Sequence, residues 1–249
     1  MRAWLRVVLG LAVMLVAVIG FAPATWLDRS LAARTQDRLR LLDAEGPWWD
    51  GRGSVATADG AARVRVAWRL NFAALLRGRL SIMLGRAGDE SQPSGLITAQ
   101  DGGIELRDLQ LRMPARIVAA FAPPLQNLAL GGDVSVRTSA FAWERTGVSG
   151  TFAAQWRRAR VVAGETIVDL GTVALTTNPP RGGRLAGTIR NDGGDVAIEG
   201  SLAVEAGAID VAMTLVPTAS ASDALRQALP MLGAPYGAGG VSVTWRSGR

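Results

Sequence analysis

The chain has 249 residues, of which 49% are hydrophobic and 19% are charged, and this composition excludes a disordered protein. It contains no cysteine, histidine or lysine, so its formal net charge of +6 comes from arginine. These absences exclude disulfide scaffolds, thiol or imidazole catalysis, Schiff-base chemistry and nearly all zinc or haem sites. Of the common enzyme mechanisms, the composition remains compatible with one that uses a pair of carboxylates.

An uncharged apolar run extends from Val7 to Ala22, preceded by Arg2 and Arg6. Counted from Leu5, a helix over this run is about 27 Å long, close to the ~30 Å of a hydrocarbon core. Residues 1–24 are therefore predicted to form a membrane anchor, with a cytoplasmic N-terminus and the rest of the chain translocated. Because Ala22-Pro23-Ala24 resembles a cleavage site, a signal peptide remains the alternative. The anchor is expected to include Val7, Leu11, Leu15, Ile19 and Ala22.

Residues 25–45 mix leucines with charged residues, a pattern that fits a linker or a short amphipathic helix. We expect a solvated connector here, and one β domain over residues 46–249. No strong boundary divides this second region, because its Pro- and Gly-rich stretches are only as long as hairpin turns.

A period of two begins at residue 63. Val64, Val66 and Trp68 alternate with arginines, which is typical of a half-buried strand. Turn residues at 101–103, 131–133, 178–180, 191–194, 205–207 and 237–240 separate further runs of this kind and favour an antiparallel meander. The runs are Ile104/Leu106, Leu109/Leu111, Val134/Val136, Phe152 toward Trp156, Val173/Leu175, Leu185 toward Ile189, Val196/Ile198, Leu202/Val204, Ile209/Val211/Met213/Leu215 and Val241/Val243/Trp245.

Three short segments have a helical pattern: 71–76, 114–121 and 222–229. Pro114 suits a first helical turn, and Ser222 is a good N-cap. Each segment is apolar on one side, so we expect it to pack on the sheet. The predicted fold is mainly β: an N-terminal transmembrane helix, then one elongated, curved antiparallel β-meander sheet with two or three short helices packed on it.

The tryptophans offer two readings. Trp48 and Trp49 form either an aromatic platform for sugar or lipid, or a pair of strand residues whose rings point to opposite faces, and the second interpretation is favoured. Trp68, Trp143, Trp156 and Trp245 fit core or cross-strand positions.

The charged residues do not indicate catalysis. The acidic residues are scattered, mostly at expected turns or outward strand positions, so we expect neither an enzyme nor a metal or cofactor site. The arginines at 63, 65 and 69 and at 157, 158 and 160 fit a solvated sheet face. If they bind anything, lipid head groups or acidic protein subunits suit a translocated protein better than nucleic acid does.

The order of these features resembles the type II secretion system protein N family. The structural motif that carries the resemblance is Gly46, Trp49 and Gly51, followed by Trp68 before Leu75-Leu76-Arg77-Gly78-Arg79-Leu80, Trp156 after Gly150-Thr151-Phe152, Asn191 before Gly200-Ser201-Leu202, and Leu225 before Leu229 and Gly233. Pro47 and Trp48 depart from the family pattern. The resemblance implies a single-pass inner-membrane protein with a periplasmic domain, acting as a non-catalytic accessory of folded-protein export.

Two functions from different classes follow. In the first, the periplasmic domain is a structural subunit that contacts other secretion subunits, either the inner-membrane platform or the secretin, through a face or an edge strand. In the alternative, an open apolar groove binds or transfers lipid, as in AsmA-like periplasmic proteins.

Overall fold

The computed structural model describes residues 23–85, 92–121, 129–145, 147–163, 166–205, 208–231, 233–237 and 239–247. The residues predicted to build the anchor, Val7, Leu11, Leu15, Ile19 and Ala22, lie outside this part, and the anchor stays a prediction. Of the helices in the described part, none combines the length and apolarity needed to cross a bilayer.

The described residues form mostly strands. The strands are β1 (Leu39–Glu45), β2 (Asp50–Thr57), β3 (Arg63–Leu70), β4 (Leu80–Leu84), β5 (Ser94–Gln100), β6 (Gly103–Pro114), β7 (Ala129–Glu144), β8 (Gly147–Gly150), β9 (Ala153–Ala163), β10 (Thr166–Thr177), β11 (Leu185–Asp192), β12 (Val196–Glu205), β13 (Ala208–Pro217), β14 (Ala234–Tyr236) and β15 (Gly240–Arg246). The helices are α2 (Thr25–Thr35), α3 (Phe72–Leu75), α4 (Ala115–Phe121), α5 (Asp223–Ala228) and the 3-10 turn η2 (Leu229–Met231).

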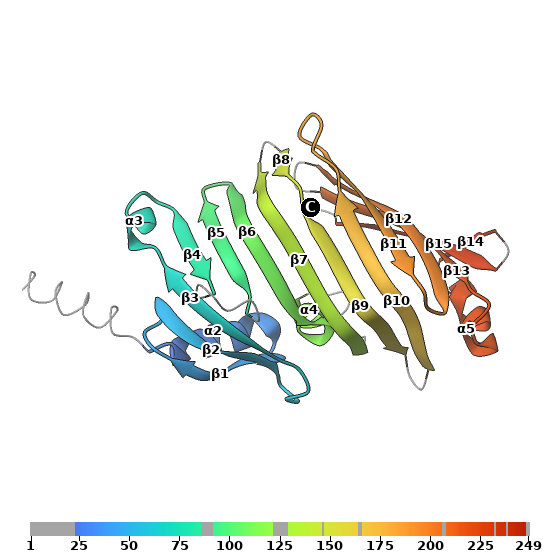
Figure 1. The fold of residues 1–249 in the computed structure, drawn as a ribbon, viewed down its shortest axis with the longest axis horizontal. Coiled ribbons are helices and arrows are strands. Elements are labelled where there is room, and N and C mark those ends of the chain that lie inside the picture. Colours follow the sequence, from blue (N-terminus) through green and yellow to red (C-terminus); the bar gives the residue numbers. More distant parts are fainter. Residues whose placement is uncertain are drawn as a thin grey trace, which may run out of the picture.

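All of these strands belong to one 15-stranded antiparallel sheet. Its order follows the chain except at two places: β8 pairs with the end of β7, and β15 lies between β13 and β14. Figure 1 shows the result, an elongated sheet that runs from the blue strands β1–β3 to the orange and red strands β11–β15. The prediction of a mainly β protein built on one large antiparallel meander is confirmed.

Strand β12 illustrates why these residues form a sheet. Val196 and Ile198 are buried, whereas Ala197 and Glu199 are exposed. Because successive side chains in a strand point to opposite faces, this alternation gives the sheet one apolar and one polar face.

Three short elements pack on the apolar face. Leu229 of η2 packs with Val241 of β15 at one end of the sheet. Ala119 of α4 packs with Leu130 of β7 near the middle. The hairpin strand β8 adds Val148, which lies in a cluster with residues of β11 and β12. These contacts cover the apolar face at three places, so the expected packing of short helices on the sheet is confirmed for α4 and α5.

The sheet begins earlier than expected. Residues 39–45 form the edge strand β1, and residues 25–35 form α2, which packs beside it (Figure 1). Leu31 of α2 and Leu39 of β1 share a core cluster with Ile117 of α4. The region 25–45, for which a linker or a short amphipathic helix is expected, thus forms α2 and β1 and packs with the rest of the sheet.

Irregular pairing bends the sheet across β7, β9 and β10. The register shifts between Gly131 and Asp133 on β7 and again around Gly171 on β10. Arg158, on the strand between them, has a φ of 51°. Bulges of this kind bend a strand and increase its local twist, which produces the curvature of the sheet.

Candidate functional surfaces

The structural motif of Gly46, Trp49 and Gly51, which we call the Gly46 motif, lies at the start of β2. Gly46 has a φ of +86°, in the left-handed region that favours glycine, and makes the turn before the strand. Gly51 of β2 lies opposite Trp68 of β3. The indole Nε1 of Trp68 donates a hydrogen bond to the carbonyl of Trp48 at 2.8 Å. The motif thus fixes the conformation of residues 46–51 against β3.

This turn places both neighbouring tryptophans against one side chain. The ring of Phe72 in α3 lies 5.5 Å from the ring of Trp49 and 6.5 Å from that of Trp48, each in edge-on geometry. We call Trp48, Trp49 and Phe72 the aromatic corner. The prediction that the two tryptophans occupy a strand with rings on opposite faces is wrong, because they precede β2, which begins at Asp50.

Helix α3 does not pack on the sheet as expected. None of its residues is buried, and Phe72 and Leu75 are exposed. The sequence reasoning did not identify this segment as a functional candidate. The available signal was its position, because an apolar turn next to Trp48 and Trp49 extends an exposed surface.

Trp156 lies apart from the aromatic corner. Its Nε1 donates to the carbonyl of Gly131 at 2.8 Å, and the ring packs with Val134 near Ala115 and Ala119 of α4. These contacts hold α4 and the irregular part of β7 together.

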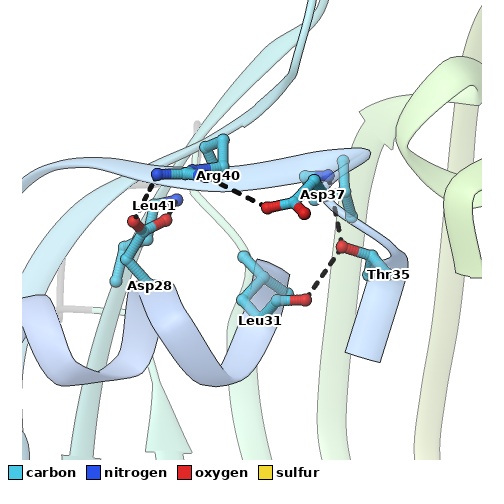
Figure 2. Close-up of polar contacts among 7 residues, drawn as sticks. Asp28, Leu31, Thr35, Asp37, Arg40 and Leu41 are labelled. Carbon is cyan, nitrogen blue, oxygen red and sulfur yellow. Dashed lines mark hydrogen bonds and ion pairs between the residues drawn. The ribbon is translucent and has the colours of Figure 1, made fainter. Parts of the chain in front are cut away.

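The free edge of β1 is closed by side chains of α2 (Figure 2). The N–H of Leu41 donates to Oδ1 of Asp28 at 2.8 Å, and the N–H of Leu39 donates to Oγ1 of Thr35 at 3.2 Å. Asp28 also forms an ion pair with Arg40 at 3.2 Å. Strand addition needs free outward N–H groups, and at Leu39 and Leu41 they are already taken.

The opposite edge of the sheet is blunted in another way. The N–H of Ser247, just after β15, donates to the carbonyl of Ile209 in β13. Along a strand, the backbone N–H and C=O of every second residue point to the same neighbouring strand, so those of Val241 also point toward β13. Pro235 pairs opposite Val241, so its own backbone faces outward, where it offers no N–H. Together with the brevity of β14, this proline disfavours strand addition at the end of the meander.

Several arginines of the polar face pair with acidic residues of nearby strands. Arg158 pairs with Asp133, and Arg160 with Asp169 at 3.6 Å. Nearer the N-terminus, on β3, Arg63 pairs with Asp43, and Arg69 pairs with Asp50 at 3.1 Å. Most of the arginines at 63, 65, 69, 157, 158 and 160 are therefore paired with carboxylates of the sheet.

The acidic residues show no convergence on a cation. Within the described ranges, no group of three or more acidic side chains has the geometry of a metal site. Asp59 accepts hydrogen bonds from the hydroxyl of Thr57 and the N–H of Ala61, and these bonds, the first above all, lower the pKa of its carboxyl. The nearby Arg116 adds a smaller effect in the same direction.

Two depressions are lined mainly by polar residues. One, of about 680 Å³, lies over β1–β3 between ion-paired side chains such as Asp43 and Arg63. The other, of about 400 Å³, lies over β6, β7 and β10 and includes Thr138 and Thr177. The first lies among charged side chains, whereas the second has Leu109 and Phe152 beside its polar residues.

Comparison with known proteins identifies a family. A family model described as type II secretion system (T2SS), protein N, matches residues 37–244. The match covers the sheet from before β1 into β15 and includes Gly46, Gly51, Trp68 and Trp156. No curated protein and no solved structure matches the chain.

Proposed function

Because the chain belongs to the type II secretion system protein N family, we propose that it is a non-catalytic, inner-membrane-anchored component of that machine. The observation that carries the proposal is the family match over residues 37–244, nearly the whole chain. Composition supports the non-catalytic role, since cysteine, histidine and lysine are all missing and many carboxylates are engaged by arginines.

In this proposal the apolar run from Val7 to Ala22 tethers the protein, and the sheet lies in the periplasm. Arg2 and Arg6 keep the N-terminus cytoplasmic. The sheet then begins close to the bilayer. With neighbouring strands ~4.8 Å apart, the meander spans roughly 60 Å from β1 to β14. The N-terminal strands are thus placed near the inner-membrane platform, and the C-terminal strands extend toward the secretin.

A deletion experiment tests the assignment to the machine. In cells without this gene, folded proteins that the machine normally exports should accumulate in the periplasm, and expression of the full chain should restore their export. Unchanged export together with unchanged assembly of the other subunits would refute the proposed role.

Site-directed crosslinking tests the contacts. The exposed residues Met83 and Tyr236 lie on β4 and β14, toward opposite ends of the sheet. A photoreactive residue at Met83 should capture platform subunits, and one at Tyr236 should capture the secretin. Capture of the same subunit from both positions would contradict the proposed orientation.

Labelling with an impermeant maleimide tests the topology. The chain has no cysteine, so Tyr236→Cys introduces a single reactive thiol. We expect it to react in intact cells whose outer membrane has been made permeable. Labelling only after lysis would place β14 in the cytoplasm and exclude the proposed orientation.

A further inference from the structure

The segment 71–80 presents a concentrated apolar surface. The exposed fractions of Phe72, Leu75, Leu76 and Leu80 are 45%, 45%, 90% and 43%. A single helical turn gains little stability by itself. Such a turn is normally stabilised by burying its apolar side chains against the rest of the protein. Here that burial is missing from the chain's own described residues, so the surface is suited to an external apolar phase.

The aromatic corner extends this surface onto the turn before β2. Phe72 links the two parts, because its ring contacts both Trp48 and Trp49. Tryptophan is enriched at the interface between bilayer and water, where an apolar ring and a polar N–H are both accommodated. The combination of partly exposed tryptophans and exposed leucines is typical of an interfacial membrane surface rather than of a sugar site.

The chain enters the folded body beside this surface. Pro23 forms an isolated β-bridge with Pro47, and the N–H of Ala24 donates to the carbonyl of Gly46 at 3.1 Å. The end of the apolar run, Ala22, is therefore one residue from a segment that adjoins Trp48. If that run lies in the bilayer, the aromatic corner is held at the membrane surface by the covalent chain.

Two arginines complete the surface. Arg77 follows Leu76 directly, and Arg79 comes after Gly78. Both are exposed, and neither forms an ion pair with an acidic residue of the described part. Arg69, by contrast, is paired with Asp50. Unpaired guanidinium groups beside exposed leucines match the arrangement of lipid phosphates above acyl chains.

We propose that Trp48, Trp49, Phe72, Leu75 and Leu76, with Arg77 and Arg79, form a second membrane contact that docks the N-terminal end of the sheet on a bilayer containing anionic phospholipid. The proposal rests on the membrane tether of the proposed function. It goes beyond that function because it fixes how the domain lies: α3 dips into the head-group region, and the sheet extends away from the membrane.

Lipid-dependent quenching tests this contact in the full-length protein. Because the chain has no cysteine, Leu76→Cys carries a single environment-sensitive fluorophore, and Tyr236→Cys, 51% exposed on β14, is the matched control. Both proteins are reconstituted into vesicles of phosphatidylcholine and phosphatidylglycerol that contain spin-labelled lipid. We expect the Leu76 probe to shift to the blue and to be quenched at least twofold more than the Tyr236 probe.

Charge dependence supplies a second readout. Arg77→Gln together with Arg79→Gln should reduce quenching of the Leu76 probe in phosphatidylglycerol vesicles and leave it unchanged in pure phosphatidylcholine. Equal quenching at both positions would overturn the contact. So would a blue shift that requires native membranes with other secretion subunits and is missing in protein-free vesicles, since the occupant would then be a protein.

The outcomes separate this proposal from the tether. A protein that sediments with the vesicles while its Leu76 probe stays in water refutes the contact and leaves the tether intact. A protein that does not associate with vesicles refutes both.

Discussion

The Cα of Gly51 faces the indole ring of Trp68 so closely that a Cβ at position 51 would lie 2.5 Å from Cζ2 of that ring. Since Trp68 also donates to the carbonyl of Trp48, the ring cannot turn away without losing that hydrogen bond. The close contact explains why a glycine is needed at position 51.

Gly51→Ala is expected to destabilise the protein by about 1–3 kcal/mol, because the added methyl group overpacks a rigid ring. Chemical denaturation of the full-length protein in detergent, followed by tryptophan fluorescence, measures the change. Gly131→Ala is the control, since a Cβ there meets only Arg160 Cβ at 3.4 Å, an ordinary contact. Equal losses in both variants would contradict the steric explanation.

Asp28→Ala should weaken the closed edge of β1. It removes the acceptor of the Leu41 N–H and the ion pair with Arg40, so we expect a loss of about 1–2 kcal/mol and faster exchange of the Leu41 amide hydrogen. Asp37→Asn also removes an ion pair with Arg40 and keeps a residue type that tolerates the φ of 60° at this position; because the Asp37 side chain is 78% exposed, its effect should stay below about 0.5 kcal/mol. Concentration-dependent association of Asp28→Ala, measured by sedimentation, would show that the edge had become available; slow exchange at Leu41 would argue against the capping role.

Leu229→Ala should cost about 2–5 kcal/mol, because Leu229 is 1% exposed and packs with Val241 under η2. Met231, two residues later, is 87% exposed, and Met231→Ala should change the free energy of unfolding by less than about 0.5 kcal/mol. Thermal unfolding of the two variants makes the comparison. Similar stabilities would mean that α5 and η2 do not cover the sheet.

The pKa of Asp59 should respond to its hydrogen bonds in a definite order. Because the folded-state pKa of Asp59 is lowered, its contribution to stability is present above the ordinary carboxyl range and is lost as the pH falls through the folded value. Thr57→Val should raise this pKa more than Arg116→Gln does, since the hydroxyl hydrogen bond is the largest cause. Side-chain carboxyl NMR titration checks the order, and a larger change in Arg116→Gln would reverse the assignment.

The sheet could be predicted where burial on one face is strong. Val196 and Ile198 alternate with exposed residues, and Ser222 accepts from the N–H of Leu225 as an N-cap. Such elements can be predicted from hydrophobic periodicity and capping residues, because the residues that form the sequence pattern are the same ones that stabilise the element.

The remaining elements depend on distant partners. Strand β1 lacks a clean alternation because Leu41 and Leu42 are adjacent apolar residues, and its edge is completed by Asp28 and Thr35 of α2. The turn at Trp48 and Trp49 depends on Gly46 and on the approach of Phe72. No local pattern reports these contacts, so the strand was predicted as a connector and the turn as a strand.

The order of strands in the meander also bears on how the protein is made. Nearly every strand pairs with the one synthesised just before it, and β14 and β15 reverse only a single step. A polypeptide that becomes available from its N-terminus onward can therefore add each new hairpin to a sheet that already exists, and unpaired segments need not wait until a distant partner has been synthesised.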